Sequence, residues 1–392
     1  MKARFQTFWD RLTFKPEPLR PGSYQKTITP ADEPPYHLHL RVEKNGRGIL
    51  ILNAKTVLHL NQTATEFALA LIQDTPLETL ALETERRYRI TREEAMADYQ
   101  KFADQLAALR KTPDLDPEIF LEIDRVEPAS DVLSAPLRLD CALTYQTSSG
   151  HADDLAPTRT VTRNLDTVEW QSILQKAWDA GIPHVVFTGG EPTIRPDLSE
   201  LIRFSQNLGQ VTGLITDGLR LTEKDYLDHL LLAGLDHLML VLDPEENQVW
   251  EALRDSMVED LSVSVHLTLS PRVRDQLPAI LDHIALYGKP QISLTADSKE
   301  AKDFMPTAQR ILAEHGFALV WSLPVPYSAA NPIRLELESA SETMNGPGRE
   351  WLYVEPDGDV LRGQGISPVL GNFLNDPFDV IWKAANELES RK

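Results

Sequence analysis

The stretch Val186-Phe-Thr-Gly-Gly-Glu-Pro-Thr-Ile-Arg-Pro-Asp-Leu198 decides the fold class of this chain. Strand-forming residues meet two glycines, an acidic residue and a proline, and apolar residues at helical spacing follow at Leu198, Leu201, Ile202 and Phe204. This order is typical of a strand that turns directly into a helix. α/β barrels place their ligand sites at the carboxyl ends of strands. The candidate site residues at this turn are therefore Gly189, Gly190, Glu191 and Pro192.

Strand and helix patterns alternate around this stretch, over residues 137–325. Strands are predicted at Leu137–Thr144, His184–Thr188, Val211–Thr216, His237–Asp243, Ser262–Ser270 and Gln291–Thr295, with a seventh candidate at Ala318–Leu323. Helices are predicted at Val168–Ala180, Pro196–Leu208, Glu223–Leu232, Glu245–Arg254, Arg274–Tyr287 and Ala301–His315. Such alternation indicates a parallel α/β sheet, and the spacing leaves both a barrel and an open twisted sheet as alternatives.

A separate small domain is predicted over residues 36–112. His37–Glu43 alternates as a half-buried strand should, Asn45-Gly46 is a hairpin signal, and Gly48–Asn53 reads as the returning strand. A third strand fits Val57–Leu60, and three helices follow. The last of these helices carries one apolar stripe at Tyr99, Phe102, Leu106 and Leu109.

Three further segments complete the expected organisation. Residues 1–35, which are rich in proline and basic residues, are predicted to be an irregular N-terminal arm, and residues 113–136 a linker. Residues 326–392 form a C-terminal extension. Within it, Trp351–Val360 is predicted to be a hairpin with Pro-Asp-Gly at its turn.

Composition excludes several classes of function. The net charge of −20 repels phosphate backbones, so no nucleic-acid partner is expected. The apolar runs are too short to span a bilayer, and the amino terminus lacks a secretory signal, so we expect a cytoplasmic protein with no membrane partner. Cys141 is the only cysteine, which excludes an intrachain disulfide and a thiolate zinc site.

The Gly189-Gly-Glu-Pro192 sequence closely resembles the motif of radical SAM (S-adenosylmethionine) enzymes. This resemblance favours an incomplete six-stranded (β/α)6 barrel. It also implies that Gly189, Gly190, Glu191 and Pro192 contact the methionyl amine of SAM. Thr216-Asp217-Gly218 and Asp243 resemble the motifs after the third and fourth strands of the family. The alternative is that all these residues only shape strand–helix turns, so that SAM binding is lost.

The cysteines that this family uses to hold its iron–sulfur cluster are absent. The matching loop runs from Cys141 to Ala152, and Thr147 and Ala152 stand where the first and last cluster cysteines are expected. The C-terminal extension resembles the SPASM type, and Gly363 stands where its cysteine is expected. Since clusters are held by thiolates, we expect neither a cluster nor reductive cleavage of SAM.

Residues 36–112 resemble the RiPP recognition element, a winged-helix domain that binds the leader peptides of ribosomally made, modified peptides. In that family the leader adds as a strand to the sheet edge and packs on the third helix. The resemblance implies a peptide site at Val57, Leu58, His59 and Leu60, facing Tyr99 and Phe102. The alternative is that the two aromatic residues belong only to the core.

These patterns lead to one main hypothesis and two alternatives. The main hypothesis is a catalytically inactive radical SAM homologue that binds a precursor or leader peptide and presents it to a partner, a cysteine-complete paralogue or another maturation enzyme. The first alternative is an enzyme of different chemistry that binds SAM or a nucleotide at the carboxyl face of the barrel. The second is a plain peptide-binding module.

Overall fold

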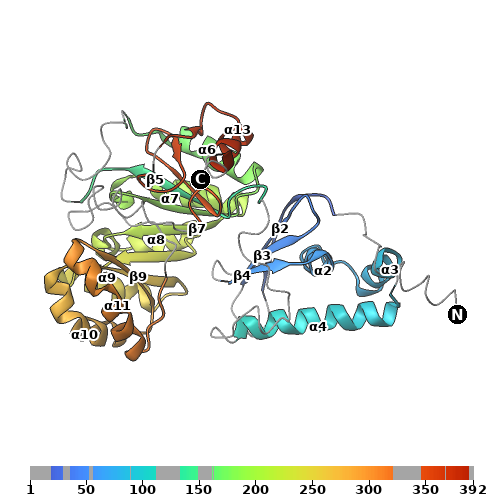
Figure 1. Cartoon of the computed structure of the whole chain (residues 1–392), viewed down its shortest axis with the longest axis horizontal. Coiled ribbons are helices and arrows are strands. Elements are labelled where there is room, and N and C mark those ends of the chain that lie inside the picture. The colour runs from blue at the N-terminus through green and yellow to red at the C-terminus, as the bar shows by residue number, and fades with distance from the viewer. Residues whose placement is uncertain are drawn as a thin grey trace. The chain divides into compact units, whose positions relative to one another are not determined.

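The computed structural model describes residues 19–29, 36–52, 56–88, 90–111, 133–148, 161, 163–320, 346–366 and 368–387. The chain divides into two compact units, Met1–Ser134 and Ala135–Lys392, called unit 1 and unit 2 below (Figure 1). Most of the predicted linker, residues 113–132, lies outside the described residues, as does the start of the C-terminal extension. Within the described ranges, no helix is long and apolar enough to cross a membrane.

Unit 1 contains a four-stranded antiparallel sheet in the order β1-β2-β3-β4. Its strands are Gly22–Ile28, Tyr36–Val42, Gly48–Leu52 and Thr56–Leu60. The prediction of an irregular arm over residues 1–35 is wrong for β1, which pairs with β2 from Gly22↔Val42 to Ile28↔Tyr36. The edge of β2 would otherwise expose a row of unpaired backbone groups, and β1 satisfies them.

Helices α2 (Gln62–Ile72), α3 (Leu77–Tyr88) and α4 (Arg92–Lys111) follow the sheet, as the sequence predicts, and α4 is one long helix (Figure 1). The side chain of Asn61 caps α2 by accepting a 2.9 Å hydrogen bond from the Ala64 N–H. The core of the unit is built from inward-facing side chains of β2, β3 and β4, together with Phe67, Leu106 and their apolar neighbours.

Unit 2 contains a nine-stranded sheet in the order β10-β9-β8-β7-β6-β5-β11-β12-β13. Its first six strands in sequence are parallel: Arg138–Thr144, His184–Gly189, Val211–Thr216, His237–Val241, Ser262–Leu269 and Gln291–Ala296. The predicted α/β fold with a partial six-stranded barrel is therefore confirmed. The barrel is open, because β5 pairs with β11 and β6 and not with β10. The seventh candidate strand is reduced to one bridge, Ile292↔Leu319, within the described residues.

Helices alternate with these strands as predicted. They are α6 (Thr167–Asp179), α7 (Leu198–Leu208), α8 (Tyr226–Ala233), α9 (Asn247–Met257), α10 (Pro271–Ala285) and α11 (Lys299–Glu314), with short 3-10 turns at Pro192–Ile194 and Leu219–Thr222. Helix α6 begins with a complete capping box between Asp166 and Glu169. Because each helix follows a parallel strand, the turns that precede the helices gather at the carboxyl edge of the sheet.

The C-terminal extension continues the same sheet. β11 (Trp351–Val354) pairs in parallel with β5, and the predicted hairpin returns as β12 (Asp359–Leu361), which pairs with β13 (Gly371–Asn372). The ammonium group of Lys176 on α6 donates hydrogen bonds to three carbonyl oxygens of the extension, at Phe373, Leu374 and Asp376. The closing helix α13 (Phe378–Glu387) follows. The extension is thus anchored on both the sheet and a barrel helix.

Candidate functional site

The two glycines of the Gly-Gly-Glu-Pro motif let the end of β6 lie directly against the end of β5. The Gly190 N–H donates to the Thr144 carbonyl at 2.8 Å, and the Glu191 N–H donates to the Gln146 carbonyl at 2.7 Å. Gly189 has a φ of 121°, which side chains rarely tolerate. A Cβ on Gly189 or Gly190 would overlap the carbonyl oxygens of Thr144 or Gln146. Both positions therefore require glycine for backbone contact.

Glu191 is buried, at 2% exposure, and its carboxylate accepts four hydrogen bonds from the chain itself. Three go to Oε1, from the Thr193 N–H at 2.9 Å, the Thr193 hydroxyl at 2.6 Å and the Thr216 hydroxyl at 2.7 Å. The fourth goes to Oε2 from the Asp217 N–H at 2.7 Å. Burial and the nearby Asp217 carboxylate raise the pKa of Glu191, and the hydrogen bonds from Thr193 and Asp217 act in the opposite direction because they favour the ionised form.

The Thr216-Asp217-Gly218 turn meets the Gly-Gly-Glu-Pro turn through this carboxylate. The turn is also held internally, because the Gly218 N–H donates to the Thr216 hydroxyl and the Leu219 N–H donates to the Asp217 carboxylate, both at 3.1 Å. Pro192 begins the 3-10 turn that leads toward α7. The structure thus brings together six of the seven residues predicted for this site.

Asp243, the seventh, has a different role. β8 ends at Val241, two residues earlier than predicted, and Asp243 is exposed. Its carboxylate accepts a 3.0 Å hydrogen bond from the Glu245 N–H. Asp residues favour such turns because their side chains can hydrogen-bond to nearby backbone. Asp243 therefore stabilises the turn before α9 and does not join the Glu191 network.

The expected cluster positions offer no thiolate in the described part of the chain. Thr147 lies just after β5 and Gly363 is buried just after β12, whereas Ala152 lies outside the described residues. Cys141 is fully buried inside β5, and burial raises the pKa of its thiol well above the usual value. Because the thiolate is the form that binds iron, Cys141 is poorly suited as a ligand.

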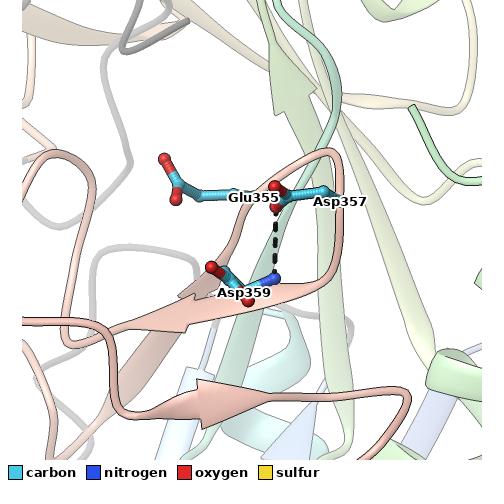
Figure 2. Close-up of side chains that lie close together, drawn as sticks. All are labelled: Glu355, Asp357 and Asp359. Atoms are coloured by element: carbon cyan, nitrogen blue, oxygen red, sulfur yellow. Dashed lines mark hydrogen bonds between the residues drawn. The ribbon is translucent and has the colours of Figure 1, made fainter. Parts of the chain in front are cut away.

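A second group of polar side chains, which the sequence analysis missed, lies on the β11–β12 hairpin. Figure 2 shows Glu355, Asp357 and Asp359 close together, and one carboxylate oxygen from each falls within 4.8 Å of the others. Glu355 accepts a 3.1 Å hydrogen bond from the Tyr145 hydroxyl. Burial, with Asp357 and Asp359 adding to it, raises the pKa of Glu355 to about 7. These carboxylates are ligands of the type that Ca²⁺ or Mg²⁺ prefers, and the Glu-Pro-Asp-Gly-Asp sequence could have indicated them.

The inner face of β9 and β10 is also polar. His266, at 1% exposure, makes hydrogen bonds of 3.0 Å with the Ser293 hydroxyl and 3.1 Å with the Thr295 hydroxyl. Burial lowers the pKa of His266 to about 4, so the imidazole is neutral near pH 7. The sequence signal is Ser262-Val-Ser-Val-His-Leu-Thr-Leu269, where polar residues alternate in a strand of a parallel sheet that is usually apolar on both faces.

In unit 1, β4 is the edge strand on the side opposite β1, as predicted for the peptide site. Leu58 and Leu60 point into the core, His59 is half-buried, and Val57 pairs with Ile51 of β3. Tyr99 is half-buried, with its ring 5.7 Å from that of Phe67. Phe102 is only 7% exposed and belongs to the core, which agrees with the alternative that it only packs there, and its contact with a peptide stays a prediction.

Comparisons with known proteins agree with this two-part organisation. Residues 141–260 match the family model of the Radical SAM superfamily, and residues 48–110 match that of Coenzyme PQQ synthesis protein D (PqqD). The chain is 28% identical over 255 residues to a PqqA peptide cyclase of Streptomyces rochei, covering 58% of this chain and 69% of that protein. It is also 28% identical over 246 residues to a PqqA peptide cyclase of Xanthomonas axonopodis pv. citri, covering 53% of this chain and 62% of the relative.

Two crystal structures of Streptococcus suis SuiB have a similar fold. SuiB bound to S-adenosylmethionine superposes with a TM-score of 0.55 at 14% identity, covering 91% of this chain and 88% of SuiB. SuiB bound to the precursor peptide SuiA gives 0.54 at 15% identity, covering 88% and 86%. At these identities the likeness establishes the fold alone. The two family matches fall in the domains predicted from the sequence, so the chain combines a radical SAM domain with a PqqD-type domain, a RiPP recognition element, and its sequence holds a single cysteine.

Proposed function

We propose that this chain is a non-catalytic radical SAM homologue that binds a leader peptide and presents it to a partner maturation enzyme. The observation that carries the proposal is the cysteine count: the 392 residues contain one cysteine, Cys141, and it is buried within β5. Iron–sulfur clusters of this family need several thiolates, and one imidazole or hydroxyl does not replace them. The donor set therefore does not fit a cluster, and no radical step is assigned to the chain.

The Glu191 network supports the loss of SAM chemistry. The family resemblance implies that this glutamate contacts the methionyl amine, but here its two oxygens accept four hydrogen bonds from Thr193, Thr216 and Asp217. A carboxylate offers about four lone-pair sites, so this one has little capacity left for an ammonium group. The network also explains how the motif can be retained for a structural reason.

The edge of β4 supports the peptide-binding part of the proposal. β1 covers the outer edge of β2, so β4 is the edge strand left without a neighbour among the strands described in unit 1. An extended peptide could add to β4 by backbone hydrogen bonds, with its side chains reading the neighbouring surface. The match to PqqD and the fold shared with SuiB, which was crystallised with its precursor peptide, favour the same ligand class.

Two measurements on the purified chain test the proposal. After anaerobic incubation with iron and sulfide, we expect no absorbance band near about 400 nm, where thiolate–iron charge transfer absorbs. A fluorescent copy of the leader peptide encoded by any short precursor gene found beside this one should bind. Two versions of the same peptide are N-methylated, one at the odd-numbered and one at the even-numbered residues. One of the two should lose binding, because strand addition needs the N–H donors that face the sheet edge. A fully occupied cluster, or binding indifferent to N-methylation in both registers, contradicts the proposal.

A second candidate function is favoured by the polar inner face of the barrel. The neutral His266 with Ser293 and Thr295 offers donors and acceptors for a polar ligand. The hydroxyl of Thr188 has no hydrogen-bond partner among the described residues, although it is buried at 1% exposure. The candidate is an enzyme that binds SAM or a nucleotide for non-radical chemistry. A ligand at about a hundred times its dissociation constant adds about 2.7 kcal/mol to stability, so a thermal shift with SAM or nucleotides separates the two candidates.

A further inference from the structure

Two histidines at the amino-terminal edge of the parallel sheet bring their imidazole rings together. His184 is the first residue of β6, and His237 is the first residue of β8. Their Nε2 atoms lie 2.5 Å apart, and the ring centroids lie 4.7 Å apart at an interplanar angle of 71°. Glu191 follows the opposite end of β6, so this pair lies at the other edge of the sheet from the site described above.

The strand between the two histidines is shaped to let the rings meet. β7 lies between β6 and β8, and its Gly213 is in register with His237. A Cβ on Gly213 would overlap the His237 imidazole. Glycine inside a strand gives up side-chain packing and costs entropy, and it often marks a place where another group approaches closely. The missing side chain of Gly213 is therefore what opens the space for the contact.

The two Nε2 atoms lie close enough to share one proton and, once the rings move apart, one metal ion. The separation is shorter than an ordinary hydrogen bond to nitrogen, which spans about 2.7–3.2 Å, so only one proton fits between the rings. Neutral imidazole is also a preferred ligand of Zn²⁺, Ni²⁺ and Cu²⁺. With metal–nitrogen bonds of about 2.0–2.1 Å at tetrahedral angles, two neighbouring nitrogens lie about 3.3 Å apart. The two Nε2 atoms, 2.5 Å apart, must therefore separate by about 0.8 Å before both can bind one metal ion.

We propose that His184 and His237 form a two-imidazole site for a divalent transition metal, with water completing the coordination. Both rings bind as neutral ligands, and the proton held between them is released to solvent. The ion clamps β6 to β8 across Gly213, at one end of a barrel that no β5–β10 pairing closes. The site is separate from the Glu191 network and from the acidic hairpin, and it does not depend on the function proposed above.

Equilibrium dialysis of the untagged full chain against Zn²⁺ tests the site. We expect one Zn²⁺ per chain, and binding weakened by about tenfold or more in each of His184→Gln and His237→Gln, since even changes to groups that only orient a ligand cost about 10–100-fold. The control variants are His229→Gln, at an exposed position on α8, and His37→Gln on β2; both should bind as the wild type does. Absent wild-type binding, or equal binding by all four variants, overturns the proposal.

Electron paramagnetic resonance of the wild-type chain with one equivalent of Cu²⁺ gives a test that needs no variant. We expect hyperfine splitting from two imidazole nitrogens. A spectrum with one nitrogen ligand or none overturns the proposal, whatever the folding behaviour of the glutamine variants.

Discussion

The hydroxyl of Thr216 donates a 2.7 Å hydrogen bond to the carboxylate of Glu191, and this bond joins the turn after β6 to the turn after β7. The same carboxylate accepts the N–H of Asp217, so one buried group holds both turns. Buried polar groups of this kind are costly when a partner is removed, because the remaining donors stay desolvated. The Gly-Gly-Glu-Pro sequence thus has a structural role, because its glutamate joins the two turns.

Replacing Glu191 by glutamine should destabilise unit 2 by about 1–3 kcal/mol. The substitution replaces one carboxylate oxygen by an NH2 group, which cannot accept the hydrogen bonds that this oxygen now accepts. Urea unfolding followed by tryptophan fluorescence measures the loss. Glu259→Gln is the matched control, since Glu259 is exposed, and its stability should stay within about 0.5 kcal/mol of wild type. Equal stability of both variants would show that the Glu191 network does not hold the turns.

Gly190→Ala should destabilise the chain by about 1–3 kcal/mol, because the added Cβ overlaps the Gln146 carbonyl and the backbone must shift. The comparison variant is Gly363→Ala, whose Cβ would lie 3.2 Å from the end of the Ile366 side chain and 3.3 Å from the Pro347 Cβ, a tight contact without the overlap found at Gly190. In the same unfolding experiment, Gly190→Ala should have a clearly lower free energy of unfolding than Gly363→Ala. A reversed order would contradict the close backbone approach between β5 and β6.

The contribution of Glu355 to stability should fall as pH rises from about 4.5 to 7, and Glu355→Gln should remove that contribution from the pH dependence. The pKa of Glu355 is raised to about 7 in the folded chain, above its unfolded value, so the protonated form is favoured by folding. Its contribution is fully present below the unfolded pKa and is lost as pH rises through the folded one. Urea unfolding midpoints from pH 4 to 8 measure how stability depends on pH. A pH dependence unchanged by Glu355→Gln would show that the pKa of this carboxyl is not raised by folding.

Removing residues 1–28 should make the chain self-associate, because the loss of β1 exposes the outer edge of β2. Size-exclusion chromatography with light scattering should detect the larger species. Removing only residues 1–18 keeps β1 and is the control, which should behave as the full chain does. If both deletion variants are monodisperse and have the molar mass of the same oligomeric state, β1 does not prevent association through the edge of β2.

Local patterns predicted most of the fold, because they are carried by neighbouring residues. The alternation at His37–Glu43, the turn at Pro356-Asp357-Gly358 and the apolar spacing after Pro196 all correspond to elements in the structure. β1 was missed because prolines surround it and its side chains are only half-buried, so its pairing with β2 leaves little local signal. The end of β8 was placed too late because Leu242 is buried but lies beyond the strand.

For the candidate sites, too, the sequence predicted some features and the tertiary structure decided others. Residue types alone establish the family resemblance, the order of strands and helices, and the lack of cluster thiolates, since folding cannot supply thiolates that a sequence with one cysteine does not contain. Only the tertiary structure decided that the Glu191 carboxylate accepts hydrogen bonds from four protein donors, that Phe102 lies in the core, and that His184 meets His237 over Gly213. Those outcomes depend on which distant segments share a strand register or a turn, and no short-range periodicity records such pairings.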